Sequence, residues 1–359
     1  MGKSRLLVGA SMTDATAAGA PFDARYLYLA GGLGPGCSSC DDAQCDPGPW
    51  WGCWQSKSDP PGQYIKGFVS RAKADGQIPW ITYYEILQSS QGAEGPAEVD
   101  AIAQPALAAR FFDDLRFLFQ TIGQETAIVH VEPDFWGYVV QKGPDPHAMP
   151  VPVPTANAAD CAGEEASVAG LGRCIVKMAR KHAPNVKIAL HFSPWVPKYD
   201  IVTNTMASVD PATEAKKLVT YMSELGALDG DLVAVDISDR DAGYDQSKGQ
   251  DTWLDASNQQ LPTYHQALAW SKALAEASGK AVVWWQLPVG NEALPNQPKK
   301  WKDNKVDYFF AHPDEFAAAH VAGVLFGAGD GDQTTPETDG GNLVAKTKAL
   351  ASAPPALCP

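Results

Sequence analysis

Apolar residues recur along the chain in two patterns that alternate. Short runs rich in branched and aromatic residues, as in buried strands, occur at Leu6–Ser11, Ala24–Gly32, Ile78–Ile86, Ala127–Val131, Val186–Phe192, Leu232–Ile237, Ala281–Leu287 and Val321–Phe326. Longer segments with helical spacing occur at Tyr64–Asp75, Pro105–Ile122, Ala166–His182, Pro211–Leu225, Thr263–Ser278, Asp314–His320 and Leu343–Ala351. Thr13–Asp23, which is small and Gly-rich, and Lys142–Asp160, which is Pro-rich, are expected to be irregular.

About eight strands alternating with helices predict a (β/α)8 barrel of the α/β class. The connections give a second signal, because those from helix to strand are short whereas those from strand to helix are often long and rich in Trp, Cys and Pro. A doubly wound open sheet is the alternative, but Gly9-Ala10-Ser11 does not supply the phosphate loop expected after its first strand. Neither a repeat nor a linker interrupts the pattern, so we expect one barrel domain over residues 1–359.

The stretch Thr126–Tyr138 places ionisable groups at the end of a buried strand. Because side chains alternate along a strand, His130, Glu132 and Asp134 are expected to share one side, and Pro133 to end the strand. Such a grouping costs free energy and is typical of catalytic sites. The alternative is structural: Asp134 caps a helix, and Glu132 pairs with a Lys or Arg.

The ends of the other strands carry carboxylates, amides and indoles, which suit a carbohydrate because indoles stack on sugar rings and polar groups bind hydroxyls. By strand parity, one of Trp284 and Trp285 must belong to the core. The predicted substrate-binding residues are Trp50, Trp51, Trp54, Tyr84, Glu85, His130, Trp136, His191, Trp195, Trp285, Gln286 and Asp330.

Cleavage of a glycosidic bond requires a proton donor and a second carboxylate. Glu132 or Asp134 is the predicted donor, because two neighbouring carboxylates repel each other and one is then held protonated. Asp236 or Asp239, two strands further along the barrel, is the predicted partner.

Two local motifs resemble known glycosidases. Glu132-Pro133-Asp134 is similar to the Glu-Pro-Asp motif of the family 6 cellulases, which implies that Asp134 is the general acid. The segment 236–241 (DISDRD) is similar to their Asp-Leu-Pro-Asp-Arg-Asp segment, although there it precedes Glu-Pro-Asp and here it follows. Glu132-Pro133 also resembles the Asn-Glu-Pro of the large retaining-glycosidase clan, which would make Glu132 the donor. Val131 and Gln286 stand where that clan has Asn and its nucleophile Glu, so we do not assign the chain to it.

The net charge and the positions of the cysteines limit which partners and which cellular compartment we expect. The net charge of −14 argues against nucleic acid or an anionic membrane surface, and no apolar run is long enough to cross a bilayer. Cys37, Cys40, Cys45 and Cys53 crowd one loop, and Cys161 and Cys174 flank a short segment, which suits disulfides in an oxidising compartment; a zinc site on the first four is the alternative, and Cys358 is the odd one. We expect a secreted or periplasmic monomer whose signal peptide has been removed, without cofactor or metal.

The prediction is therefore a secreted glycoside hydrolase acting on a β-linked, glucan-type polysaccharide. A glycan-binding barrel that has lost a catalytic carboxylate is the main alternative, suggested by Gln286. A hydrolase using Ser193 and His191 is disfavoured because no G-x-S-x-G elbow surrounds the serine. A metal-dependent hydrolase using His130, His191 and Asp236 is the remaining enzyme class considered. Calcium binding at Asp330-Gly331-Asp332 is disfavoured because the EF-hand spacing is absent.

Overall fold

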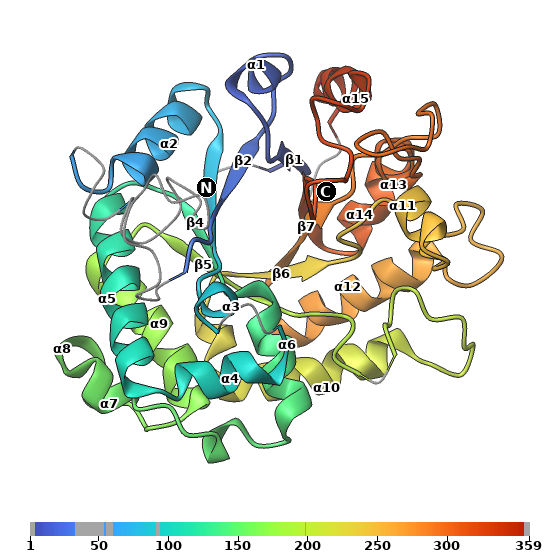
Figure 1. The fold of residues 1–359 in the computed structure, drawn as a ribbon. Helices are drawn as coiled ribbons and strands as arrows, with labels where there is room; N and C mark the ends of the chain where they lie inside the picture. The colour runs from blue at the N-terminus through green and yellow to red at the C-terminus, as the bar shows by residue number, and fades with distance from the viewer. Residues whose placement is uncertain (1–3, 33–53, 55–59, 91–93, 198, 355–359) are drawn as a thin grey trace.

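Eight parallel strands close into a barrel, which confirms the predicted fold class (Figure 1). The computed structural model describes residues 4–32, 54, 60–90, 94–197 and 199–354. Each strand pairs in parallel with the next, and the last pairs with the first. The strands are β1 Leu7–Ala10, β2 Ala24–Leu29, β3 Ile78–Tyr83, β4 Ile128–Val131, β5 Lys187–His191, β6 Leu232–Asp236, β7 Ala281–Leu287 and β8 Val321–Phe326.

Helices surround the strands (Figure 1). They are α1 Asp14–Ala17, α2 Gln63–Ala74, α3 Ile86–Ser89, α4 Pro96–Ile102, α5 Pro105–Ile122, α6 Pro133–Lys142, α7 Val153–Ala156, α8 Ala158–Cys161, α9 Val168–His182, α10 Pro211–Glu224, α11 Ala242–Ser247, α12 Tyr264–Ser278, α13 Lys305–Ala311, α14 Pro313–Ala318 and α15 Asn342–Ser352, with the 3₁₀ turns η2 Pro146–Ala148 and η3 Ala227–Asp229. Within the described ranges, none of these helices has both the length and the apolar character needed to cross a membrane.

The inside of the barrel is filled by every second residue of the strands. Large rings such as Tyr26, Trp80 and Trp285 meet small residues such as Ala189 and Ala234 in one buried cluster. Because the strands tilt and converge, alternation of large and small side chains lets the interior close without a void. The opposite faces of the strands pack against the helices in a second, larger cluster.

The long helices follow the periodicity of the sequence. In α5, the predicted stripe of Phe111, Leu115, Leu118 and Ile122 is buried throughout. Differences occur in short elements: Thr13–Asp23 contains α1, and Lys142–Asp160 contains η2, α7 and part of α8, where irregular chain was expected. These pieces are single turns, too short to show a periodicity of apolar positions.

The predicted use of cysteines in disulfides is confirmed at one pair. Cys161, at the end of α8, is bonded to Cys174 in α9. The bond fastens the end of the loop that follows α6 to the helix behind it. Cys37, Cys40, Cys45, Cys53 and Cys358 lie outside the described residues.

Candidate active site

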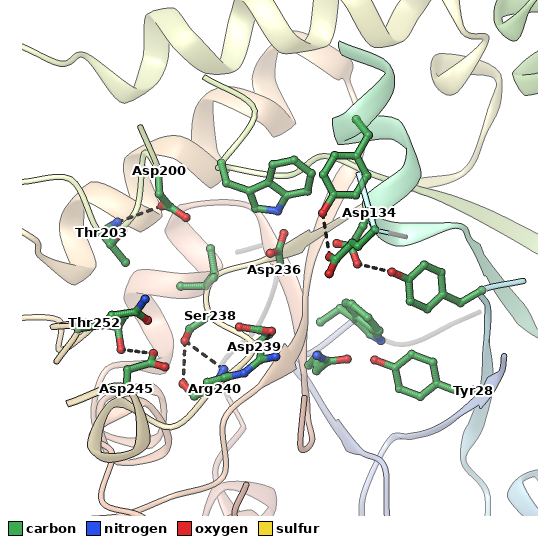
Figure 2. A pocket seen from close by; sticks show the side chains of 18 residues that line it. Tyr28, Asp134, Asp200, Thr203, Asp236, Ser238, Asp239, Arg240, Asp245 and Thr252 are labelled. Carbon is green, nitrogen blue, oxygen red and sulfur yellow. Dashed lines mark hydrogen bonds and ion pairs between the residues drawn. The ribbon is translucent and has the colours of Figure 1, made fainter. Parts of the chain in front are cut away.

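A cavity of about 470 Å³ opens at the ends of the strands where the strand-to-helix loops begin, the face on which barrel enzymes carry their active sites (Figure 2). Carboxylates, hydroxyls and aromatic rings line it. The lining residues are Tyr28, Tyr84, Glu94, Asp134, Tyr138, Trp195, Asp200, Thr203, Asp236, Ile237, Ser238, Asp239, Arg240, Asp245, Gln250, Thr252, Trp285 and Gln286.

Asp134 enters the cavity from the first turn of α6. The strand β4 ends at Val131, Glu132 adopts a left-handed conformation (φ 49°), and Pro133 begins the helix. Proline suits this first position because its missing N–H would have no partner there. Asp134 Oδ2 accepts a hydrogen bond from the Tyr84 hydroxyl at 2.7 Å. Burial and then the neighbouring Asp236 carboxylate raise the pKa of Asp134 to about 6, although the Tyr84 bond opposes this.

Asp236, at the end of β6, is held by a chain of two histidines. His191 Nε2 lies 2.6 Å from Asp236 Oδ1, and His191 Nδ1 lies 3.1 Å from His130 Nε2. Both histidines are fully buried inside the barrel, and burial lowers the pKa of His130 well below its usual range. A neutral His130 that donates from Nε2 leaves His191 to donate from Nε2 to Asp236, which fixes the orientation of that carboxyl group.

Aromatic rings form part of the wall. Trp195 packs against Tyr138 with ring centroids 4.9 Å apart. The close approach depends on Gly137, because a Cβ there would lie 2.3 Å from the Trp195 ring. Deeper in the barrel, the Trp285 ring contacts Tyr28, with centroids 5.7 Å apart. Rings placed in this way suit the apolar faces of sugar units.

The loops after β6, β7 and β8 are joined below the cavity by Asp241. Its two carboxylate oxygens accept the backbone N–H groups of Gly290 at 2.8 Å and Thr334 at 2.7 Å. Asp241 is fully buried and is not among the residues that line the cavity. This side chain therefore positions the three loops that carry one wall of the site.

Glu132 does not share a face with Asp134, contrary to the prediction. Its Oε1 accepts the backbone N–H groups of Glu85 at 2.9 Å and Ile86 at 3.2 Å, and its side chain has no exposed surface. The left-handed backbone at Glu132 breaks the alternation on which the prediction relied. Glu85 is also fully buried, with Oε2 2.5 Å from the N–H of Gly32, so neither glutamate lines the cavity.

Other predicted contacts also lie away from the cavity. Trp54 is buried in the core, where its Nε1 donates to Asp114 Oδ1 at 3.1 Å. Trp136 is buried as well and donates to the Val131 carbonyl at 2.8 Å. Asp330 does not line the cavity but pairs with Arg240, its Oδ2 3.3 Å from Nε. Trp136 follows the predicted site directly in the sequence, but the geometry of α6 turns its indole into the core.

The cavity does bring together part of the predicted set. Its lining includes Asp134, Asp236 and Asp239 from the catalytic candidates, and Tyr84, Trp195, Trp285 and Gln286 from the binding candidates. His130 and His191 are buried beneath it, and Trp284 is in the core while Trp285 faces the cavity, as parity requires. Trp50 and Trp51 lie outside the described residues.

Sequence reasoning missed several lining residues, among them Tyr28, Glu94, Asp200 and Asp245. Tyr28 was detectable, because alternation in β2 sends Tyr26 and Tyr28 to the inside. Glu94 and Asp200 lie in loops and Asp245 in the short helix α11, all within strand-to-helix connections where no periodicity indicates the direction of a side chain.

No protein-family model matches this chain, and no curated protein sequence does either. Solved structures are similar in fold. A modular endo-β-1,4-mannanase from Cellulomonas fimi, of glycoside hydrolase family 26, has a TM-score of 0.54 and 12% identity, over 97% of this chain and 70% of that one. The endo-β-1,4-mannanase from Thermotoga petrophila has a TM-score of 0.50 and 10% identity, over 98% and 77%. At these identities the likeness shows the barrel fold alone.

The endoglucanase Cel6 from Mycobacterium tuberculosis also matches, with a TM-score of 0.33 and 12% identity, over 61% of this chain and 55% of that one. A likeness of this size carries no argument about family. The resemblance of Glu132-Pro133-Asp134 to the family 6 motif therefore remains a prediction from sequence.

Proposed function

We propose that this protein is a glycoside hydrolase that cleaves a β-linked, glucan-type polysaccharide. The observation that carries the proposal is the pairing of Asp134, whose pKa lies near 6, with Asp236 in a cavity walled by aromatic rings at the mouth of the barrel. Barrels of similar fold include enzymes named as endo-β-1,4-mannanases, which adds to the plausibility of a polysaccharide substrate.

Asp134 is the proposed proton donor. With a pKa of about 6, this carboxyl group is protonated in a useful fraction of the molecules close to neutral pH, and it still gives up the proton readily. The proton passes to the glycosidic oxygen as its bond to the anomeric carbon breaks. The first sugar chain then leaves as an alcohol.

Asp236 is the proposed second carboxylate. It either takes a proton from the attacking water or attacks the anomeric carbon itself, after which water completes the hydrolysis. In both cases it must be correctly oriented, and the hydrogen bond to His191 serves this need. His191 and His130 are therefore positioning residues that act through Asp236.

Asp239 remains a weaker candidate for a catalytic role. Its carboxylate is half exposed and forms an ion pair with Arg240. A carboxylate already paired with a guanidinium is a poor base, because the positive charge stabilises its ionised form. We therefore propose that Asp239 binds substrate.

The proposed location is outside the cytoplasm. The Cys161–Cys174 disulfide supports it, because such bonds persist mainly in oxidising compartments. A polysaccharide outside the cell can be cleaved only by an enzyme that is also outside the cytoplasm.

The test is incubation with a panel of β-linked polysaccharides, scored by the release of reducing ends. The proposal expects release from at least one polymer, and a loss of roughly 10²–10⁴ in kcat for Asp134→Asn and for Asp236→Asn. Asp229→Asn is the matched control, because Asp229 is exposed in η3, which precedes β6 at the opposite end of the barrel.

A glycan-binding barrel without activity is the second candidate, favoured by Gln286 at the end of β7. It expects retention on a polymer without any reducing ends. Release of reducing ends that persists in both aspartate variants would contradict the proposed catalytic pair.

A further inference from the structure

The cavity carries a large imbalance of charge. Six carboxyl groups line it, and Arg240 is the one Lys or Arg among its described lining residues. The six are Glu94, Asp134, Asp200, Asp236, Asp239 and Asp245. Arg240 is already paired with Asp239 and with Asp330, and these two carboxylates neutralise its positive charge. The other five carboxyl groups have no cation within the lining.

These carboxyl groups are fixed in place across the cavity. Asp200 Oδ1 accepts the backbone N–H groups of Val202 at 2.6 Å and Thr203 at 3.1 Å. Asp245 Oδ2 accepts the Thr252 hydroxyl at 2.7 Å. In the view of Figure 2, Asp236 lies between Asp134 on one side and Asp200 and Asp245 on the other.

Burial makes the excess of charge costly. It raises the pKa of Asp200 to about 6, and the neighbouring Asp236 adds to this effect. Asp200 is pre-organised by two N–H bonds and still has a raised pKa, and no Lys or Arg among the described lining residues pairs with it. A positively charged ligand would supply a counter-charge, and would restore the ionised form.

A second observation points to a ligand rich in hydrogen-bond donors. Gln286 lines the cavity with 5% of its surface exposed, and its Oε1 has no hydrogen-bond partner. Its backbone is in the left-handed region (φ 58°), a conformation that is unfavourable for a residue other than Gly. An unpaired buried acceptor is unfavourable, and since the Gln286 side chain lines the cavity, rotation of its amide would present this oxygen to an ammonium or hydroxyl group of a ligand.

We propose that the substrate is a polymer of β-linked amino sugars with free amines, bound through ammonium groups at the carboxylates of the cavity. This inference rests on the proposed glycosidase function and narrows the glucan-type backbone proposed above to one that carries free amines in place of hydroxyl groups. Trp195 and Tyr138 take the apolar faces of the sugar rings, and Asp200 and Asp245 take the ammonium groups of units beside the cleaved bond. A neutral glucan would exclude water from the same carboxylates without bringing a positive charge to balance their negative charge.

A metal ion is a poorer match to this charge. Among the described residues, no group of three or more His, Cys, Asp or Glu side chains is arranged to hold one. The carboxylates are spread along the cavity, as expected for a ligand with several separate charges.

The experiment compares three polymers of matched length: a β-1,4-glucosamine polymer, its fully N-acetylated form, and an unsubstituted β-1,4-glucan. The amine polymer is expected to have the highest kcat/KM, by about tenfold or more. This advantage should shrink when the salt concentration rises from about 0.02 to about 0.5 M, because salt screens charge pairs. Equal or faster cleavage of the glucan would overturn the inference while leaving the proposed glycosidase intact.

Two variants refine the test. Asp200→Asn should lower the ratio of kcat/KM for the amine polymer to that for the glucan by about fivefold, the usual weight of one partly exposed charge pair. Asp229→Asn removes the same charge at the far end of the barrel and should leave the ratio unchanged. An unchanged ratio in Asp200→Asn would contradict the assigned role of Asp200.

If no polymer is cleaved, the proposed function fails, and binding decides the inference separately. Calorimetry with a glucosamine oligomer should then show salt-sensitive binding that is weakened in Asp200→Asn. Binding that is absent, or equal for the N-acetylated oligomer, would reject the amino-sugar assignment.

Discussion

The hydrogen bond from Tyr84 to Asp134 offers a direct test of the proton donor. Replacing Tyr84 with Phe removes the hydroxyl that lies 2.7 Å from Asp134 Oδ2 and leaves the ring in place. Since this hydroxyl stabilises the carboxylate, its loss makes ionisation harder and raises the pKa of Asp134 above about 6.

The size of the shift follows from the strength of such bonds. A hydrogen bond to a charged group contributes about 1.5–3 kcal/mol when buried. Asp134 is partly exposed, so the lower end applies, and about 1.4 kcal/mol corresponds to one pKa unit. We therefore expect a rise of about one unit.

The assay is the pH dependence of kcat/KM on a cleaved polymer. A general acid works only while protonated, so activity is present below its pKa and lost as the pH rises through it. The alkaline limb of the profile should accordingly move up by about one unit in Tyr84→Phe. An alkaline limb that stays in place, or moves down, would refute Asp134 as the donor.

Tyr138→Phe is the matched control. It removes another phenol hydroxyl from the same cavity, but this one donates to Glu94 at 2.8 Å. The alkaline limb should move by much less than in Tyr84→Phe. Thermal unfolding of both variants checks that the fold is kept.

His191→Leu should lower kcat by about 10- to 100-fold, because Asp236 loses a bond at 2.6 Å; an unchanged kcat would contradict the positioning role. Glu132→Gln keeps one oxygen that can accept the N–H groups of Glu85 and Ile86 but replaces Oε2, which also lies 3.2 Å from the Ile86 N–H, with an N–H₂ donor, so urea denaturation should show a loss of about 1–2 kcal/mol, with kcat within about threefold of the wild type. A hundredfold loss of kcat at unchanged stability would instead restore Glu132 as a catalyst. Replacing both Cys161 and Cys174 with Ala should lower the free energy of unfolding by about 3 kcal/mol, as expected for a cross-link spanning 13 residues; equal urea midpoints would count against this.

The barrel was predictable because its strands and long helices bury whole faces. Apolar periodicity in a helix such as α5 indicates which face of the helix packs against the barrel. The short helix-to-strand connections indicate that helices and strands alternate around it. Parity also separated Trp284 from Trp285 correctly. These features depend on repeated patterns, which a sequence displays directly.

The site was only partly predictable, because its geometry depends on single backbone angles and long loops. Strand alternation was extended one residue too far at Glu132, where the left-handed backbone turns the side chain beneath the cavity. Asp200 reaches the cavity from a loop and Asp245 from the short helix α11, within connections whose course the sequence does not reveal. The composition of the strand ends predicted a site rich in carboxylates and aromatic rings at one end of the barrel. The roles of individual carboxylates could be proposed only from their positions in the structure.

The central claim is that Asp134 protonates the departing sugar oxygen, and leaving-group dependence tests it most directly. The measurement is kcat/KM of Asp134→Asn relative to the wild type, on a polysaccharide and on a glycosyl fluoride of the same sugar, whose leaving group needs no strong acid. The account predicts a loss of roughly 10²–10⁴ on the polysaccharide and a far smaller loss on the fluoride. Equal losses on both substrates would contradict it.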